Sequence, residues 1–153
     1  MNIRRVILGG MLMLGVGLKA HAQEPVQWSY SAKALANGTY EIKLAATIQN
    51  GWHMYSQKQP DDAIALPTTI TFTKSPLLEL EGGTKEEGAL DAHVDPALGT
   101  TSNQYVHKVD FVQVVKLKAK AQTNITGTIQ FQVCTDKECL PPATTHFAIP
   151  LKG

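Results

Sequence analysis

Cysteine is scarce in this sequence: its 153 residues include only Cys134 and Cys139. Two thiols cannot build a four-cysteine zinc site, and no Cys-x-x-Cys or His-x-x-x-His spacing indicates a site of mixed ligands. The histidines that could join such a site are spread along the chain, at His53, His93, His107 and His146. A metal site is therefore not expected.

The motifs of several enzyme classes are missing too, and so is a strong charge of either sign. No serine-nucleophile motif, phosphate-binding loop or pair of catalytic carboxylates stands out, so no cofactor is expected. The chain has 14 Lys plus Arg against 13 Asp plus Glu. This balance argues against binding to nucleic acid or to an anionic membrane surface.

An apolar run long enough to cross a bilayer is absent. The run from Val6 to Leu18 has 13 residues, whereas a spanning helix needs about 20. Two arginines precede it and Ala20-His21-Ala22 follows, which is the pattern of a secretory signal peptide. We therefore predict a signal peptide over residues 1–22, a periplasmic location, and one mature domain over residues 23–153 with no membrane span.

Amphipathic helices are lacking. The sequence instead has short runs in which apolar and polar residues alternate, and turn signals separate these runs. Strands are expected near residues 27–35, 40–48, 68–73, 77–80, 89–94, 105–117, 128–133 and 144–151. Asn37-Gly38 predicts a hairpin turn, and the glycines of 82–88 and 124–127 indicate further turns. Seven to nine such strands predict an all-β, antiparallel, immunoglobulin-like sandwich, although the Cys…Trp…Cys spacing of antibody domains is absent.

The two cysteines lie five positions apart, after an alternating apolar run and before a double proline. A disulfide between them would close a loop of six residues and constrain the unfolded chain by only ~2 kcal/mol, against ~3 kcal/mol for a loop of fifteen. Such a bond is a weak brace, which favours a reversible dithiol/disulfide pair. A purely structural hairpin disulfide remains the alternative.

Three segments, in this order, resemble one family. They are Gly51-Trp52-His53-Met54-Tyr55-Ser56-Gln57, a tyrosine-containing strand further on, and the Cys134…Cys139-Leu140-Pro141-Pro142 end. Together they resemble the amino-terminal periplasmic domain of DsbD, the thiol:disulfide interchange protein. The resemblance covers essentially the whole mature chain, and it implies an immunoglobulin-like fold with both cysteines on one hairpin.

The resemblance also implies roles for individual residues. Cys139 would form the mixed disulfide with a partner and Cys134 would resolve it. A cap loop over Asp95–Thr100, with Leu98 as its apolar lid, would shield the pair, and Tyr55 would pack beside it. Tyr55 and Leu98 can equally be residues that only pack locally. The family has an aromatic residue in the cap and one more residue between the cysteines, and this sequence has neither.

The function implied is periplasmic thiol:disulfide interchange, an activity of the protein-disulfide reductase kind. Electrons would pass through Cys134 and Cys139 between a thioredoxin-like or membrane DsbD-type protein and periplasmic substrate proteins. These 153 residues hold neither a membrane electron-conducting domain nor a thioredoxin-like domain, so both are expected on other chains. The alternative is a non-catalytic immunoglobulin-like binding module whose disulfide only ties its hairpin.

Overall fold

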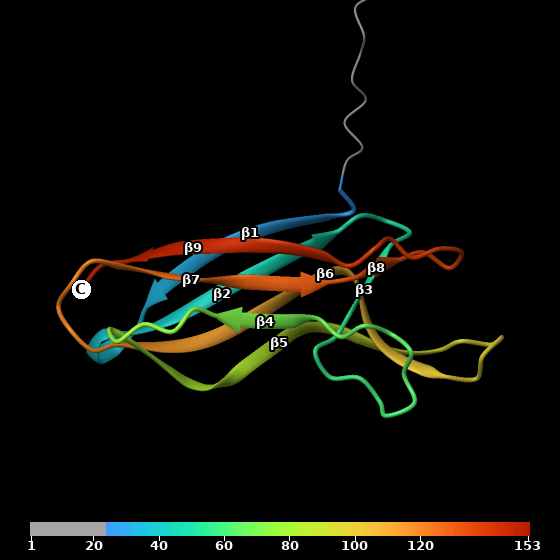
Figure 1. Cartoon of the computed structure of the whole chain (residues 1–153), viewed down its shortest axis with the longest axis horizontal. Helices are drawn as coiled ribbons and strands as arrows, with labels where there is room; N and C mark the ends of the chain where they lie inside the picture. The colour runs from blue at the N-terminus through green and yellow to red at the C-terminus, as the bar shows by residue number, and fades with distance from the viewer. Residues whose placement is uncertain (1–23) are drawn as a thin grey trace, which may run out of the picture.

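The computed structural model describes residues 24–153, so the predicted signal peptide lies outside the described residues. In this part of the chain the regular structure is nine strands and one short 3-10 turn. The strands are β1 (Val26–Ala34), β2 (Thr39–Ile48), β3 (His53–Tyr55), β4 (Thr69–Phe72), β5 (Leu78–Val94), β6 (Thr101–Leu117), β7 (Thr123–Phe131), β8 (Val133–Cys134) and β9 (Ala143–Leu151). Within residues 24–153 no helix is long and apolar enough to cross a membrane. The predicted all-β, immunoglobulin-like class is confirmed (Figure 1).

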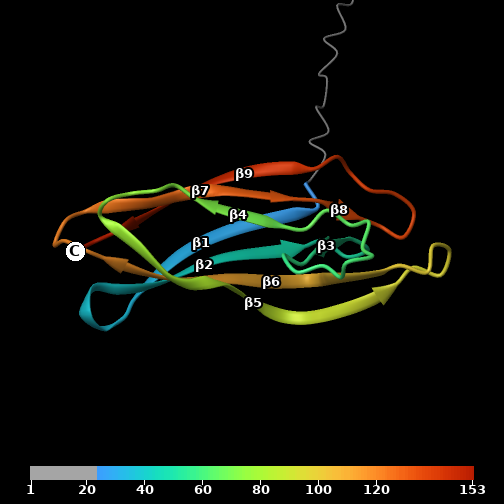
Figure 2. The same cartoon turned by 60° about the horizontal axis from the view of Figure 1, so that its bottom comes forward.

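The strands form two antiparallel sheets that pack as layers (Figures 1 and 2). In the larger sheet, β6 is central: β5 pairs with one of its edges, and β2 and β3 follow one another along the other edge. Next to these, β1 pairs with β2 and β8 pairs with β3. The smaller sheet has the order β4-β7-β9. The short strand β8 is therefore an outer strand of the larger sheet, reached by the chain directly from the smaller one.

The core lies between the layers and is made by the alternation that the sequence displays. Along β2, residues Tyr40, Ile42, Leu44, Ala46 and Ile48 are all buried, with more exposed residues between them. Opposite side chains come from the smaller sheet, including Ile125, Ile129 and Phe147. Full burial of a large apolar side chain stabilises a fold by ~1.5–3 kcal/mol. This core supplies a rigid support for whatever the loops carry.

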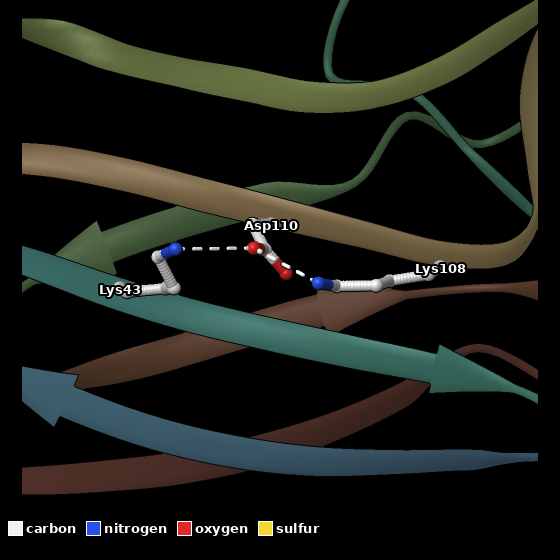
Figure 3. Close-up of polar contacts among 3 residues, drawn as sticks. All are labelled: Lys43, Lys108 and Asp110. Carbon is white, nitrogen blue, oxygen red and sulfur yellow. Dashed lines mark ion pairs between the residues drawn. The ribbon is translucent and has the colours of Figure 1, made fainter.

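On the outer face of the larger sheet, a buried carboxylate is balanced by two lysines. Asp110 of β6 has a side chain only 8% exposed, and its carboxylate lies 3.3 Å from the Lys43 ammonium and 3.4 Å from that of Lys108 (Figure 3). The lysines are 38% and 66% exposed, so water screens both pairs. The group joins β2 to β6, and we regard it as structural.

The turn at Asn37-Gly38 is confirmed, since both residues have positive φ, 57° and 70°. The turn expected at 82–88 is wrong, because these residues belong to the long edge strand β5. Two register shifts, between Glu81 and Lys85 and between Gly88 and Leu90, interrupt its pairing with β6. Bulges of this kind accommodate glycine-rich, charged sequence within a strand.

The turn expected at 124–127 is also wrong, because β7 begins at Thr123. Gly127 lies inside this strand, opposite Phe72 of β4 and Phe147 of β9. A Cβ atom at this position would lie 2.3 Å from the Thr71 carbonyl oxygen and 2.5 Å from the Phe147 ring. The glycine is therefore explained by close packing and not by a turn.

Candidate functional site

Strand β8 and the turn after it, which carry the two cysteines, lie at the end of the sandwich opposite the C-terminus (Figures 1 and 2). Strand β7 ends at Phe131, and the chain then crosses to the larger sheet as β8. There Val133 pairs with Met54 and Cys134 pairs with His53, both of β3. The sheet register therefore fixes the first cysteine, while the second follows a tight turn.

Backbone hydrogen bonds hold this turn on both sides of the cysteine pair. The Thr135 amide donates to the Glu138 carbonyl at 2.7 Å, and the Leu140 amide donates to the Val133 carbonyl at 3.0 Å. The cysteines between them occupy a non-hydrogen-bonded pair, the kind in which side chains lie closest. They form a disulfide, with Cα atoms 4.0 Å apart. These backbone hydrogen bonds do not involve sulfur. They therefore hold the two residues opposite each other independently of the disulfide.

The two sulfur-bearing residues differ strongly in exposure. Cys134 is only 1% exposed, whereas Cys139 is exposed. Cys139 is thus the residue of the pair that faces solvent, and Cys134 is buried beside β3. The disulfide therefore has an accessible side and a protected side.

Tyr55, at the end of β3, contacts the protected side. Its hydroxyl group donates a hydrogen bond to the Cys134 Sγ atom at 3.3 Å. Burial, and then the nearby Asp95 carboxylate, raise the pKa of Tyr55. The phenol therefore stays protonated, and remains a donor, at neutral pH.

His53 lies on the same outer face of β3 as Tyr55, because Met54 between them points into the core. The two rings meet edge to face, with centroids 5.4 Å apart. Burial lowers the pKa of His53, and the positive form of His93 lowers it further, while Asp136 and Asp91 oppose this. His53 was not among the residues predicted for the site, although its alternation with Met54 and Tyr55 was a usable signal.

The predicted cap forms the tip of the β5–β6 hairpin, at the same end as the cysteines (Figures 1 and 2). The Asp95 carboxylate accepts hydrogen bonds from the amides of Ala97 at 2.7 Å and Leu98 at 3.0 Å, and it thereby orders this turn. The Leu98 side chain is 64% exposed. Within residues 24–153 this side chain is thus mostly uncovered, and its shielding of the cysteines stays a prediction.

A carboxylate that the sequence analysis missed anchors the segment after Tyr55. Glu86 of β5 accepts hydrogen bonds from the Ser56 hydroxyl at 2.7 Å, the Gln57 amide at 2.6 Å and the Tyr105 hydroxyl at 2.8 Å. Burial and the bond to Glu86 raise the pKa of Tyr105. Glu86 therefore joins β5, β6 and the end of β3 beside the site.

Residues 24–153 contain few groups that could support a chemistry other than thiol–disulfide exchange. Among residues 24–153, no three His, Cys, Asp or Glu side chains converge as metal ligands. An apolar hollow of about 140 Å³ borders the cysteine hairpin and is lined by Val26, Phe131, Leu140 and Pro141 among others. The disulfide is thus the reactive group that this end of the molecule presents.

An accessible disulfide on a hairpin of an immunoglobulin-like sandwich is the arrangement of a thiol:disulfide interchange domain. Residues 20–151 match the family described as "Thiol:disulfide interchange protein DsbD, N-terminal". The chain belongs to this family. The resemblance inferred from the cysteine segment is thereby confirmed.

Solved structures agree on the fold. The chain is similar to the DsbD N-terminal domain of Neisseria meningitidis in its reduced form, with 18% identity, a TM-score of 0.54, and coverage of 82% of this chain and 86% of that one. It is similar to the N-terminal periplasmic domain of ScsB from Proteus mirabilis, with 17% identity, a TM-score of 0.57, and coverage of 88% and 49%. A third similar structure is the complex between the DsbD and PilB N-terminal domains from Neisseria meningitidis, with 16% identity, a TM-score of 0.50, and coverage of 83% and 84%. No curated protein sequence matches the chain.

Proposed function

We propose that this protein relays electrons between partner proteins in the periplasm by opening and re-forming the disulfide between Cys134 and Cys139. The observation that carries the proposal is the contrast in exposure, 1% for Cys134 against an exposed Cys139. Exchange requires a thiolate to reach one sulfur and the other sulfur to leave. The contrast supports attack at Cys139 and departure of Cys134.

The reaction begins when a thiolate of a reduced partner attacks the Cys139 Sγ atom. The bond between the cysteines breaks, its electron pair stays on Cys134, and a mixed disulfide joins the partner to Cys139. The partner's second thiolate then attacks the partner's own sulfur in that bond and releases Cys139. The domain has gained two electrons, the partner is oxidised to a disulfide, and the same steps in reverse reduce a substrate.

Tyr55 is proposed to assist the departure of Cys134, because its hydroxyl group already donates to that sulfur at 3.3 Å. Charge grows on the sulfur as the bond breaks, and hydrogen bonds to charged groups are stronger than those to neutral ones. Leu98 is proposed to shield the cysteines through a movement of its turn, which lies at the same end of the sandwich. Both roles would control the rate of exchange and leave its stoichiometry unchanged.

Tyr55→Phe is expected to slow the opening of the disulfide about fivefold and to lower its reduction potential by about 20 mV. Both figures correspond to the loss of one hydrogen bond of about 1 kcal/mol. The measurements are stopped-flow reduction by a thioredoxin-like protein and equilibration with glutathione. Tyr30→Phe is the matched control, because the Tyr30 hydroxyl lies 3.4 Å from the Thr145 Oγ1 atom and is not bonded to either cysteine. An equal effect of both changes would remove Tyr55 from the mechanism.

The partners proposed are a thioredoxin-like protein as electron donor and periplasmic proteins as acceptors. In support, a similar structure is a complex of a DsbD N-terminal domain with the PilB N-terminal domain, and the similar ScsB domain is described as periplasmic. Export of this chain rests on the signal peptide proposed for residues 1–22, with residues 23–153 as the mature domain.

The reduction potential of the folded protein tests the proposed function. We expect a value above about −300 mV and rapid reduction by a thioredoxin-like protein, because structural disulfides of exported proteins usually lie below that value. The competing function is a binding module with a structural disulfide. It predicts a lower potential and a bond that the folded protein does not open to thioredoxin-like reductants.

A further inference from the structure

His53 and Cys134 occupy directly opposite positions in the pairing of β3 with β8. In an antiparallel pair, opposite residues point to the same face, with Cβ atoms ~4.5–5.5 Å apart. The imidazole is half-buried and also packs against the Tyr55 ring, whose hydroxyl group bonds to the Cys134 sulfur. A titratable ring is thus fixed beside the protected sulfur of the disulfide.

The charged groups that face His53 come from two other segments. Asp136 lies in the cysteine turn, and Asp91 and His93 lie on β5 across the sheet. Burial is the largest influence and lowers the pKa of His53, so the ring is neutral at pH 7 beside an intact disulfide. The two carboxylates raise the pKa of His53, but in the oxidised state this effect is smaller than that of burial.

Reduction changes this balance, because it places a negative charge on the group directly opposite the ring. An anion at such a separation favours the protonated form of an imidazole. A protonated histidine in turn lowers the pKa of a neighbouring thiol. The two groups therefore titrate together in the reduced protein, although only one of them titrates in the oxidised protein.

We propose that His53 takes up a proton when the disulfide opens and holds Cys134 as a thiolate in an imidazolium–thiolate pair. This inference rests on the proposed function. It makes His53 a positioning residue, which holds the negative charge on Cys134 at the site of that function. The step balances in protons and electrons. The partner dithiol becomes a disulfide, one of its two protons passes to Cys139, which becomes a thiol, and the other passes to His53. No further oxidant or reductant is involved.

The pair has a consequence for the delivery of electrons. After Cys139 has formed a mixed disulfide with a substrate, Cys134 must attack the Cys139 Sγ atom to release that substrate. An ordinary thiol, with a pKa near ~8.5, is only a few per cent thiolate at pH 7. The imidazolium keeps Cys134 reactive at neutral and mildly acidic pH.

The test is the pH dependence of the thiolate absorbance of Cys134 in the reduced protein, assigned with a Cys139→Ser variant that keeps one thiol. His53→Gln is expected to reduce the thiolate fraction at pH 7 about tenfold, which is a shift of about one unit in the pKa of Cys134. Alkylation of Cys134 should fall about threefold, because a less acidic thiolate is intrinsically more nucleophilic. His93→Gln, which changes the more distant histidine on β5, is the matched control.

A second measurement needs no variant: NMR titration of the His53 ring in the wild-type protein. Its pKa is expected to be higher in the reduced state than in the oxidised state. An unchanged pKa of His53 on reduction, or an unchanged pKa of Cys134 in His53→Gln, would overturn the inference. His53→Gln can still exchange with a thioredoxin-like protein while its Cys134 thiolate has the same pH dependence as in the wild-type protein. In that case the proposed function survives and this inference alone fails.

Discussion

A Cys134→Ala variant is expected to accumulate as a mixed disulfide with a thioredoxin-like partner, whereas a Cys139→Ala variant is expected to form none. In the first variant the exposed Cys139 sulfur remains, and the group that would resolve the bond is gone. In the second, the remaining sulfur belongs to a residue only 1% exposed. In both variants the remaining cysteine is the attacking thiolate, and the attacked sulfur is on the partner. Since thiol–disulfide exchange requires the two sulfurs to reach each other, the contrast between the variants should be nearly all-or-none.

The partner for this experiment carries a single cysteine, activated as a mixed disulfide with an aromatic thiol, so that it cannot reverse the reaction itself. Non-reducing electrophoresis and mass spectrometry then quantify the adduct and locate it on Cys139. The Cys134→Ala, Cys139→Ala double variant controls for non-covalent association. Equal trapping by both single variants would contradict the assignment of Cys139 as the cysteine that forms the mixed disulfide with the partner. If Cys134→Ala forms no adduct, the proposed relay fails.

The fold was predictable where the alternation of residues is undisturbed. Residues 40–48 alternate between apolar and mostly polar residues, and β2 spans Thr39–Ile48 with buried and more exposed residues in turn. The region 82–88 has no such alternation, because β5 is an exposed edge strand with bulges and places few side chains in the core. Alternation in the local sequence cannot reveal a strand that pairs along its backbone with a neighbour and buries few apolar side chains.

The functional site, like the fold, was only partly predictable from the sequence. The spacing of Cys134 and Cys139 is local, so their pairing on a hairpin could be inferred from a short stretch. The positions of His53 and Glu86 could not, because they depend on registers between segments far apart in the chain. Alternation does predict that His53 shares a face with Tyr55, but not that β8 pairs beside them.

The largest effect expected on stability comes from Gly127→Ala. The added Cβ atom would lie 2.3 Å from the Thr71 carbonyl oxygen and 2.5 Å from the Phe147 ring, so β4, β7 or β9 must move. Overpacking of this kind destabilises proteins by ~1–3 kcal/mol and occasionally more. For a domain of this length, that corresponds to a fall in Tm on the order of 10 °C. Thermal unfolding followed by circular dichroism measures it.

Gly83→Ala is the matched control, because no atom lies within 4 Å of the Cβ position there and its φ is not positive. It should be neutral or stabilising by up to ~1 kcal/mol, through a less flexible unfolded chain. Equal losses of stability in the two variants would refute the packing explanation for Gly127. The reduction potential of folded Gly127→Ala should match the wild-type value, because the strained contacts lie in the smaller sheet and the disulfide is bordered by β3. A changed potential would instead mean that the packing of the smaller sheet is transmitted along β7 to the cysteine hairpin.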